Sequence, residues 1–172
     1  MIKKLIKYIV IRFLLIIKHC PYIPFLKVIR LRSWCYRFAL KSMGSNTYIL
    51  DAVTILSPEK LELGKRVSIH ENSLLACQGG VKIGDCVAIG SNFIISSSEH
   101  INKDTSKLIK DQGIKSLPVA IGNNVWIGAR VTILMGVKIG NNSIIGAGSL
   151  VNKDIPDNVV AAGVPAKIIR KR

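Results

Sequence analysis

An apolar β-branched residue returns at every sixth position between Ile121 and Pro156, with almost no slippage. A second series, also mostly apolar, follows four positions after the first. A period of six fits neither the 3.6-residue α-helix nor an isolated strand, and it indicates a solenoid that repeats one short strand and one corner. The first series is Ile121, Ile127, Ile133, Ile139, Ile145 and Val151, and the second is Val125, Val131, Val137, Ser143, Ser149 and Ile155.

The two series also predict where side chains point. Within one hexad, a residue of the first series and the residue four later share the inward face of an extended segment. The residues between them take the corner and the outer face, where Gly and Asn suit tight or left-handed backbone. These corner pairs are Asn123-Asn124, Ala129-Arg130 and Asn141-Asn142.

The chain before Ile121 follows the same period less regularly. Three blocks keep the six-residue step, and steps of eight separate them: Ile49 and Ile55; Leu63, Ile69 and Leu75; Ile83, Ile89 and Ile95. Each step of eight predicts a small bulge at a corner, at Ser57-Pro58 and at Gly79-Gly80. Residues 96–118 are polar, rich in Lys and unlike a repeat, so they predict a long loop excursion, and such loops are usually functional.

Three segments besides the hexads point to a known family: Val125-Trp126-Ile127-Gly128, Ile-Gly-Ala-Gly-Ser at 145–149 and Ala-Ala-Gly-Val-Pro-Ala-Lys at 161–167. Together they resemble the hexapeptide-repeat acyltransferases, in the sugar O-acetyltransferase branch with galactoside, maltose and exopolysaccharide acetyltransferases. The resemblance covers roughly residues 45–170. It implies an all-β fold, a left-handed parallel β-helix with three faces, in a homotrimer that uses acetyl-CoA. Handedness rests on the resemblance alone, because right-handed crossovers are the general expectation.

The first 44 residues predict a separate helical arm before a β-helix domain at 45–172. The net charge is +15, and ten basic residues precede the first acid, Asp51. Residues 8–17 are apolar except for Arg12, which leaves the run short of the roughly 18–20 residues that span a bilayer. A second amphipathic stretch covers residues 26–43. Two interpretations stay open: peripheral contact with an anionic membrane at its inner face, or a cap on the first coil or a trimer neighbour.

The cysteines and the charge exclude other classes of protein. Cys20, Cys35, Cys77 and Cys86 show neither CxxC nor Cys/His metal spacing, so we expect reduced thiols in a cytoplasmic chain and no metal site. The basic residues lack interleaved aromatics or a nucleic-acid-binding motif, which argues against nucleic acid as a partner.

His100, at the start of the excursion, is the candidate catalytic residue. Enzymes of the resembling family carry their catalytic histidine at this place, although many follow it with proline where this chain has Ile101. A neutral imidazole can take the proton of a sugar hydroxyl as its oxygen attacks a thioester. By composition alone, a solvated loop histidine is the simpler interpretation. His70 and His19 are rival bases, and either Glu99 or Asp104 is a candidate to orient the His100 ring.

The resemblance also implies a coenzyme A site along the regular coils. Trp126, Gly128 and Ala129 match the stretch whose backbone amides bind the pantetheine arm, with the Ala129 amide as candidate oxyanion donor. Gly146 and Ala147 in the next coil are small enough for the coenzyme to approach the backbone, while Lys153 and Lys167 would meet the phosphates. Alternatively, the glycines serve only the corners and Trp126 serves a subunit interface.

The expected function is acetyl transfer from acetyl-CoA to a hydroxyl of a saccharide, a glycan or polysaccharide precursor. Direct transfer is favoured because no Ser, Cys or carboxylate pair offers a better nucleophile than the acceptor itself. The same chemistry on an amino sugar, serine or an antibiotic is the alternative, followed by a non-catalytic β-helix scaffold.

Overall fold

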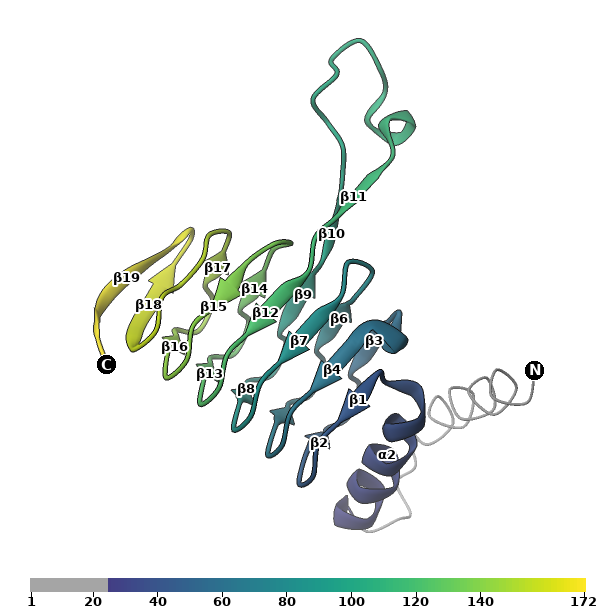
Figure 1. Cartoon of the computed structure of the whole chain (residues 1–172), viewed down its shortest axis with the longest axis vertical. Coiled ribbons are helices and arrows are strands. Elements are labelled where there is room, and N and C mark those ends of the chain that lie inside the picture. The colour runs from purple at the N-terminus through teal and green to yellow at the C-terminus, as the bar shows by residue number, and fades with distance from the viewer. Residues whose placement is uncertain (1–24) are drawn as a thin grey trace, which may run out of the picture.

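The computed structural model describes residues 25–172, so the expected helix at residues 8–17, His19 and Cys20 lie outside the described part. Its strands stack into a long solenoid with helix α2 (Phe25–Ala39) at the N-terminal end (Figure 1). The chain visits three parallel sheets in turn, so each coil contributes one strand to each face. The predicted three-faced parallel β-helix is therefore confirmed.

The three sheets are called A, B and C in the order in which the chain meets them. Sheet A comprises β1 (Ser42–Met43), β4 (Leu61–Leu63), β7 (Val81–Ile83), β12 (Val119–Ile121) and β15 (Lys138–Ile139). Sheet B comprises β2 (Tyr48–Ile49), β5 (Ser68–Ile69), β8 (Ala88–Ile89), β13 (Trp126–Ile127), β16 (Ile144–Ile145), β18 (Val159–Gly163) and an antiparallel β19 (Ala166–Lys171). Sheet C comprises β3 (Thr54–Leu56), β6 (Leu74–Ala76), β9 (Ile94–Ser96), β14 (Thr132–Ile133) and β17 (Leu150–Val151).

The core is the stack of inward residues that the six-residue period predicts. Every member of both series from Ile121 to Ile155 is buried, and Ile127 and Ile133 are completely enclosed. Each fully buried side chain of this size stabilises the fold by about 1.5–3 kcal/mol. Ser143 and Ser149 are buried as well, and hydrogen bonds from their hydroxyls to Pro156 O and Gly146 O satisfy them at 2.8 and 2.6 Å.

The corner pairs adopt the expected left-handed backbone at their second residue. Asn124, Arg130 and Asn142 have φ values of 54°, 57° and 56°. Asn tolerates this region through local hydrogen bonding, whereas Arg130 has no such advantage. The stacked coils impose the conformation on whichever residue occupies the corner.

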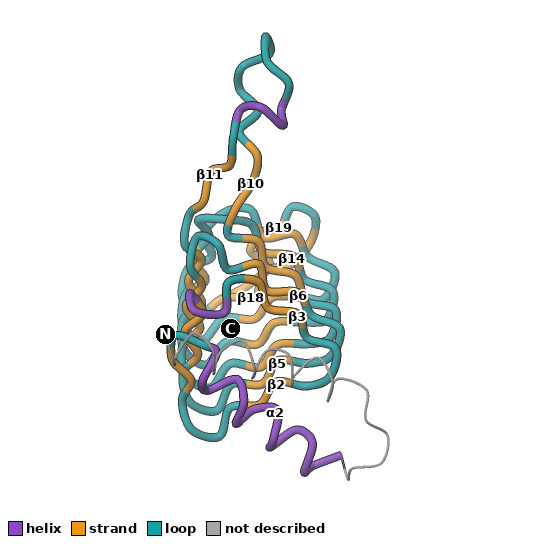
Figure 2. The backbone as a smooth tube through the Cα atoms, turned by 90° about the vertical axis from the view of Figure 1, so that its right-hand side faces the viewer, coloured by secondary structure: helices purple, strands orange, loops and turns teal. Residues whose placement is uncertain are grey.

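All three interruptions of the period fall at the corner between sheets C and A. The first is a short 3-10 helix, η1 (Pro58–Lys60), and the second is a turn that contains Gly79. The third is the excursion, an antiparallel hairpin of β10 (Ser98–His100) and β11 (Ile114–Ser116) with η2 (Ile109–Gln112) between them. This hairpin projects beyond the stack of coils in both views (Figure 1 and Figure 2).

Helix α2 covers the open N-terminal end of the core. Arg32 forms a 2.9 Å ion pair with Asp51, and the Ile49 amide donates to Ser33 Oγ at 3.4 Å. Burial raises the pKa of Tyr36 to about 12, and its hydroxyl donates to Val53 O. The capping interpretation thus holds for this part of the arm.

Strand β1 pairs with β4, so the β-helix begins at Ser42, before the expected boundary at residue 45. Helix α2, the longest in the described part of the chain, is too short and too polar to cross a bilayer.

Candidate functional site

At the corner between sheets A and B, side chains of the corner itself accept hydrogen bonds from the backbone amides. Asn141 Oδ1 accepts from Asn123 N, Asn123 Oδ1 accepts from Asp85 N, and Asp85 Oδ1 accepts from Lys65 N, each at 2.8 Å. Asp157 continues the ladder by accepting from Asn141 N at 2.7 Å. From the third coil onward, an Asp or Asn therefore uses the amide of the coil before it.

The corner between sheets B and C has the same backbone but leaves these amides open. Its equivalent positions are Glu71, Ser91, Ala129 and Ala147. No acceptor lies within hydrogen-bonding reach of these four N–H groups in the described residues. Ala129 and Ala147 are exposed. A column of unused donors therefore runs along this edge, and it suits a ligand with carbonyl groups spaced along a chain.

Glycines allow the coils to approach at this edge. A Cβ on Gly128 would lie 2.6 Å from Ala147 N, and a Cβ on Gly90 would lie 2.7 Å from Ala129 N. A Cβ on Gly146 would meet the Ala162 side chain at 2.7 Å. A side chain at either position would point into the next coil. Gly128 and Gly146 are therefore needed for the coils to stack closely, independently of any role in ligand binding.

The other expected coenzyme residues divide between two corners. Trp126 is 58% exposed on β13, the strand that leads directly into the open corner. Lys167 pairs with Ala162 across β18 and β19, at the C-terminal end of the column. Lys153 follows β17 and precedes Ile155, which bridges to sheet A, so it lies at the corner between sheets C and A. The structure thus groups the predicted residues except Lys153 along one edge.

The hairpin that carries His100 is fixed at its base. Ser97 is fully buried, and its hydroxyl accepts from Gly79 N and donates to Ala76 O, both at 2.8 Å. A Cβ on Gly79 would collide with Ser97 O and would lie 2.7 Å from Leu117 O, so only glycine fits beside the two hairpin strands. Gly79 was identified in the sequence as part of a predicted bulge, whereas Ser97 was not singled out.

His100 itself lies at the end of β10, paired with Ile114, and is exposed. In the described part of the chain nothing donates to or accepts from its ring. The ring is free to meet a substrate or another chain.

Neither candidate carboxylate contacts His100 within this chain. Glu99 precedes it on the same strand, and successive strand residues face opposite sides. The Asp104 carboxylate accepts from the Ser106 hydroxyl at 2.6 Å and pairs with Lys107 at 3.1 Å. These hydrogen bonds, first that of Ser106 and then that of Lys107, lower the pKa of Asp104.

None of the rival groups lies on the hairpin that carries His100. Burial, followed by the charge of Glu59, raises the pKa of Cys77 to about 12. Cys35 is buried and Cys86 is exposed, and both are free thiols like Cys77. His70 is exposed at the corner between sheets B and C, with its ring 3.9 Å from the Glu71 carboxylate.

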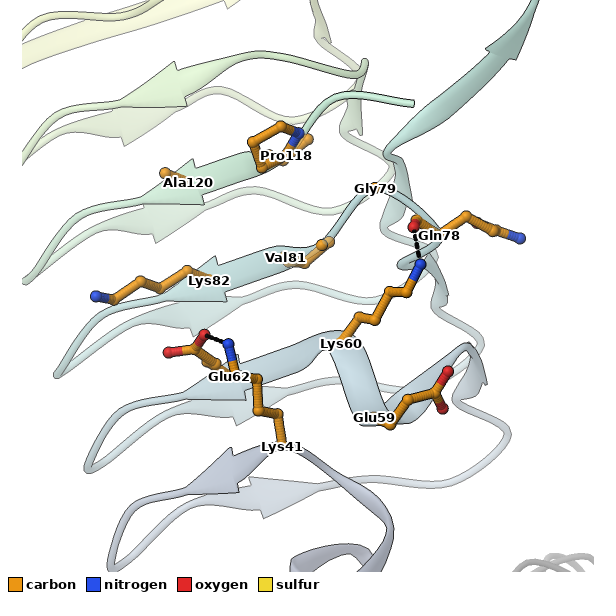
Figure 3. Close-up of a pocket in the computed structure, with 12 residues that line it drawn as sticks. Lys41, Glu59, Lys60, Glu62, Gln78, Gly79, Val81, Lys82, Pro118 and Ala120 are labelled. Carbon is orange, nitrogen blue, oxygen red and sulfur yellow. Dashed lines mark hydrogen bonds and ion pairs between the residues drawn. The ribbon is translucent and has the colours of Figure 1, made fainter. Parts of the chain in front are cut away.

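A hollow of about 600 Å³ lies on sheet A beside the hairpin base (Figure 3). Lys60 Nζ reaches across it to Gln78 O at 2.6 Å, and Lys41 pairs with Glu62 at 2.7 Å. The hydrogen bond from Lys41 lowers the pKa of Glu62. Gln78 Oε1 is buried without a hydrogen-bond partner among the described residues.

The hollow was not identified from the sequence, although the six-residue period shows which residues of sheet A face outward beside it. In each strand of sheet A, the residue directly before the last inward-facing residue points outward. The register of the strands aligns these outward residues into one ladder across the sheet. The ladder is Ser42, Glu62, Lys82, Ala120 and Lys138. The corresponding outer ladder of sheet C is more apolar and consists of Thr54, Leu74, Ile94, Thr132 and Leu150.

Comparisons with known proteins agree with this architecture. The family model "Bacterial transferase hexapeptide (six repeats)" matches residues 118–153. The galactoside O-acetyltransferase of Escherichia coli K12 is 42% identical over 130 residues, which are 76% of this chain and 63% of that relative. The putative colanic acid biosynthesis acetyltransferase WcaF of the same strain is 31% identical over 143 residues, covering 83% of this chain and 76% of the relative.

A solved structure of a galactoside acetyltransferase in complex with coenzyme A superposes with a TM-score of 0.83 at 34% identity. The match covers 98% of this chain and 82% of that one. The chain spans less than two thirds of the length of the galactoside O-acetyltransferase relative. The repeats, the stacked coils and these matches lead to one conclusion: the chain belongs to the hexapeptide-repeat transferase family.

Proposed function

We propose that this protein is an O-acetyltransferase that moves the acetyl group of acetyl-CoA to a hydroxyl of a saccharide. The observation that carries the proposal is the column of open amides at Ala129 and Ala147 in a chain similar to a galactoside O-acetyltransferase. The saccharide acceptor is supported by that relative's name and by that of the colanic acid biosynthesis acetyltransferase.

The chain's residues fit the donor as follows. The open N–H of Ala147 donates to an amide carbonyl of the pantetheine arm, and the Ala129 N–H donates to the thioester oxygen as negative charge develops there. Lys167, at the end of the same edge, supplies positive charge for the phosphates, and Lys153, at the corner between sheets C and A, adds to it only from the neighbouring subunit. Acetyl-CoA supplies an activated acyl group when bound.

His100 acts as the general base in this proposal. Its neutral ring takes the proton from the acceptor hydroxyl as that oxygen forms a bond to the acetyl carbon. The carbon–sulfur bond breaks, and the departing thiolate receives the proton from the His100 ring. Direct transfer of this kind needs no enzyme nucleophile, consistent with the buried Cys77 and its raised pKa.

The complete site needs a second chain. The His100 hairpin leaves at the corner between sheets C and A, whereas Ala129 lies at the corner between sheets B and C. The two corners are opposite edges of sheet C, so the hairpin of one subunit meets the amides of another. A homotrimer would also cover the apolar outer residues Leu74, Ile94 and Leu150 of sheet C.

The hollow on sheet A is the proposed acceptor site. Sugar hydroxyls both donate and accept, and the hollow offers Lys41, Lys60 and Lys82 as donors and the partly exposed Glu62 carboxylate as an acceptor. It lies at the base of the hairpin that carries His100, with Gly79 and Pro118 in its lining.

The test is thiol release from acetyl-CoA with a panel of galactosides, other sugars, amino sugars and serine. We expect turnover with a sugar and a loss of about 10²- to 10⁴-fold in kcat for His100→Ala, with coenzyme A affinity unchanged. His70→Ala serves as the rival variant and should lose less than tenfold. A loss below about tenfold in His100→Ala would remove this residue as the base.

Two further outcomes bear on the acceptor and on the assembly. Turnover confined to amino sugars or serine would contradict the saccharide hydroxyl as acceptor. Sedimentation should give a mass of three chains of 18.9 kDa each. A monomer with full activity would contradict a site shared between subunits.

A further inference from the structure

The outer face of helix α2 carries a stripe of aromatic and basic side chains that the β-helix does not use. Its exposed members are Arg30, Leu31, Trp34, Arg37 and Phe38, called here the α2 stripe. At about 100° per residue they fill a single arc of about 120°. Trp34 and Phe38 are 56% and 51% exposed, and their rings meet edge to face at 4.8 Å.

The opposite face of the helix already performs the capping role. Cys35 and Ala39 are buried against the first coil, Arg32 is paired with Asp51, and Ser33 accepts from Ile49 N. Within the described part of the chain, only Arg37 of the stripe makes a hydrogen bond, to Gly44 O at 3.3 Å. Exposed Trp and Phe are therefore not needed to close the end of the solenoid.

We propose that the α2 stripe docks this protein on the surface of an anionic lipid bilayer. Trp and Phe prefer the boundary between headgroups and acyl chains, where a ring can insert without the helix crossing the membrane. Arg30 and Arg37 border the aromatic residues on one side of the arc, where they can meet anionic headgroups. The helix then lies in the plane of the headgroup layer.

The charge of the surrounding chain favours this partner over a second copy of the protein. Ten basic residues and no acid precede Asp51 in the sequence. A homotypic contact through the stripe would bring like charges together, which costs several kcal/mol in protein interfaces. An anionic membrane instead attracts the exposed Arg30 and Arg37 of the stripe.

The size of the stripe argues against a protein partner. A stable protein interface engages roughly 20–30 residues on each side. The stripe offers three apolar side chains on one helix, which is little for a protein surface and sufficient for shallow insertion beside electrostatic attraction.

Flotation of the full-length protein with lipid vesicles tests the proposal. We expect binding to vesicles that contain phosphatidylglycerol, weak binding to pure phosphatidylcholine, and release at high salt. The double variant Trp34→Ser with Phe38→Ser should partition at least about tenfold less. The matched control, Leu108→Ser with Ile109→Ser, removes side chains that are 74% and 56% exposed at the hairpin and should bind like wild type.

Fluorescence separates membrane insertion from coverage by the protein itself. The chain has two tryptophans, so Trp126→Phe leaves Trp34 as the reporter. Its emission should move to shorter wavelength when anionic vesicles are added. Emission already typical of a buried indole, and unchanged by vesicles, would mean that other residues of this protein cover the stripe, and would overturn the proposal.

Two other results would also overturn it: equal binding to both vesicle types, or full binding by the Trp34→Ser, Phe38→Ser variant. Circular dichroism and thermal melting confirm that the variant is folded. Its acetyl transfer to a soluble sugar should match wild type, so the membrane proposal and the proposed function fail or succeed separately.

Discussion

The corner between sheets A and B and the corner between sheets B and C are built alike but used differently. Each begins with a glycine, Gly122 or Gly128, and two positions later has a residue with left-handed backbone, Asn124 or Arg130. The difference is one side chain per coil. Asp or Asn occupies the amides of Lys65, Asp85, Asn123 and Asn141 at the first corner, whereas Ala129 and its neighbours leave the amides open at the second. A single repeated position thus decides whether backbone donors serve the fold or a ligand.

Gly128→Ala should disrupt the packing of the coils at the corner between sheets B and C. The new Cβ would lie 2.6 Å from Ala147 N, and a backbone atom held in the stack cannot move aside. We expect a loss of about 3 kcal/mol in the free energy of unfolding. Urea denaturation at fixed protein concentration measures it, with Ala129→Ser, at an exposed site, changing stability by less than about 0.5 kcal/mol. Wild-type stability for Gly128→Ala would mean that the coils are not in contact here.

Ala147→Asn should convert the open corner into a copy of the closed one. Asn141 reaches Asn123 N from eighteen residues along the chain, and position 147 stands at the same spacing from Ala129. The new Oδ1 would occupy the Ala129 N–H without straining the fold. We expect coenzyme A to bind at least about tenfold more weakly, about 1.4 kcal/mol, by calorimetry.

Ala147→Leu is the control for this substitution, because it has a similar size and no acceptor. It should weaken binding less than Ala147→Asn does. If both variants weaken binding equally, bulk rather than the occupied amide is responsible, and the open column is not the binding feature.

Much of this contrast was readable in the sequence. The six-residue period correctly placed Ile127 and Val131 inward, since the geometry of an extended segment fixes which residues share a face. It also located the corner pairs, because chemistry at a turn is local. The contrast between Ala129 and Asn123 was visible too, but its meaning depends on which coil lies beneath each amide.

Other features depend on long-range geometry, which the six-residue period does not specify. The hollow around Gln78 is lined from several coils and from Pro118 at the hairpin base, so its existence depends on how the hairpin leaves the stack. The separation of His100 from Ala129 across sheet C likewise follows from the order of the corners in space. The period revealed the excursion but not its direction.

Asn123→Ala should open one position of the closed corner. Asp85 N would lose the Oδ1 that accepts from it at 2.8 Å, although water can replace this acceptor because the bond is exposed. We therefore expect a loss of about 1 kcal/mol in unfolding free energy. Hydrogen exchange at the Asp85 amide should become faster, while the Lys65 amide, held by Asp85 Oδ1, stays protected. Unchanged exchange at Asp85 would contradict a structural role for the ladder.

Asp104→Asn should have the smallest effect, and it distinguishes the hairpin from both corners. The Asp104 carboxylate is held by Ser106 and Lys107 within the hairpin, and these contacts keep its pKa below the ordinary value of 3.8. Such a depressed pKa stabilises local structure at pH values above the ordinary one, and the contribution is lost as pH falls through the depressed value. The carboxylate therefore stays ionised throughout any assay near neutrality and contributes no inflection to the rate profile. We expect kcat/KM of Asp104→Asn to stay within about threefold of wild type with the same pH profile. A shifted profile would instead mean that Asp104 orients His100 in the assembled site, and that the hairpin rearranges when its partner chain is present.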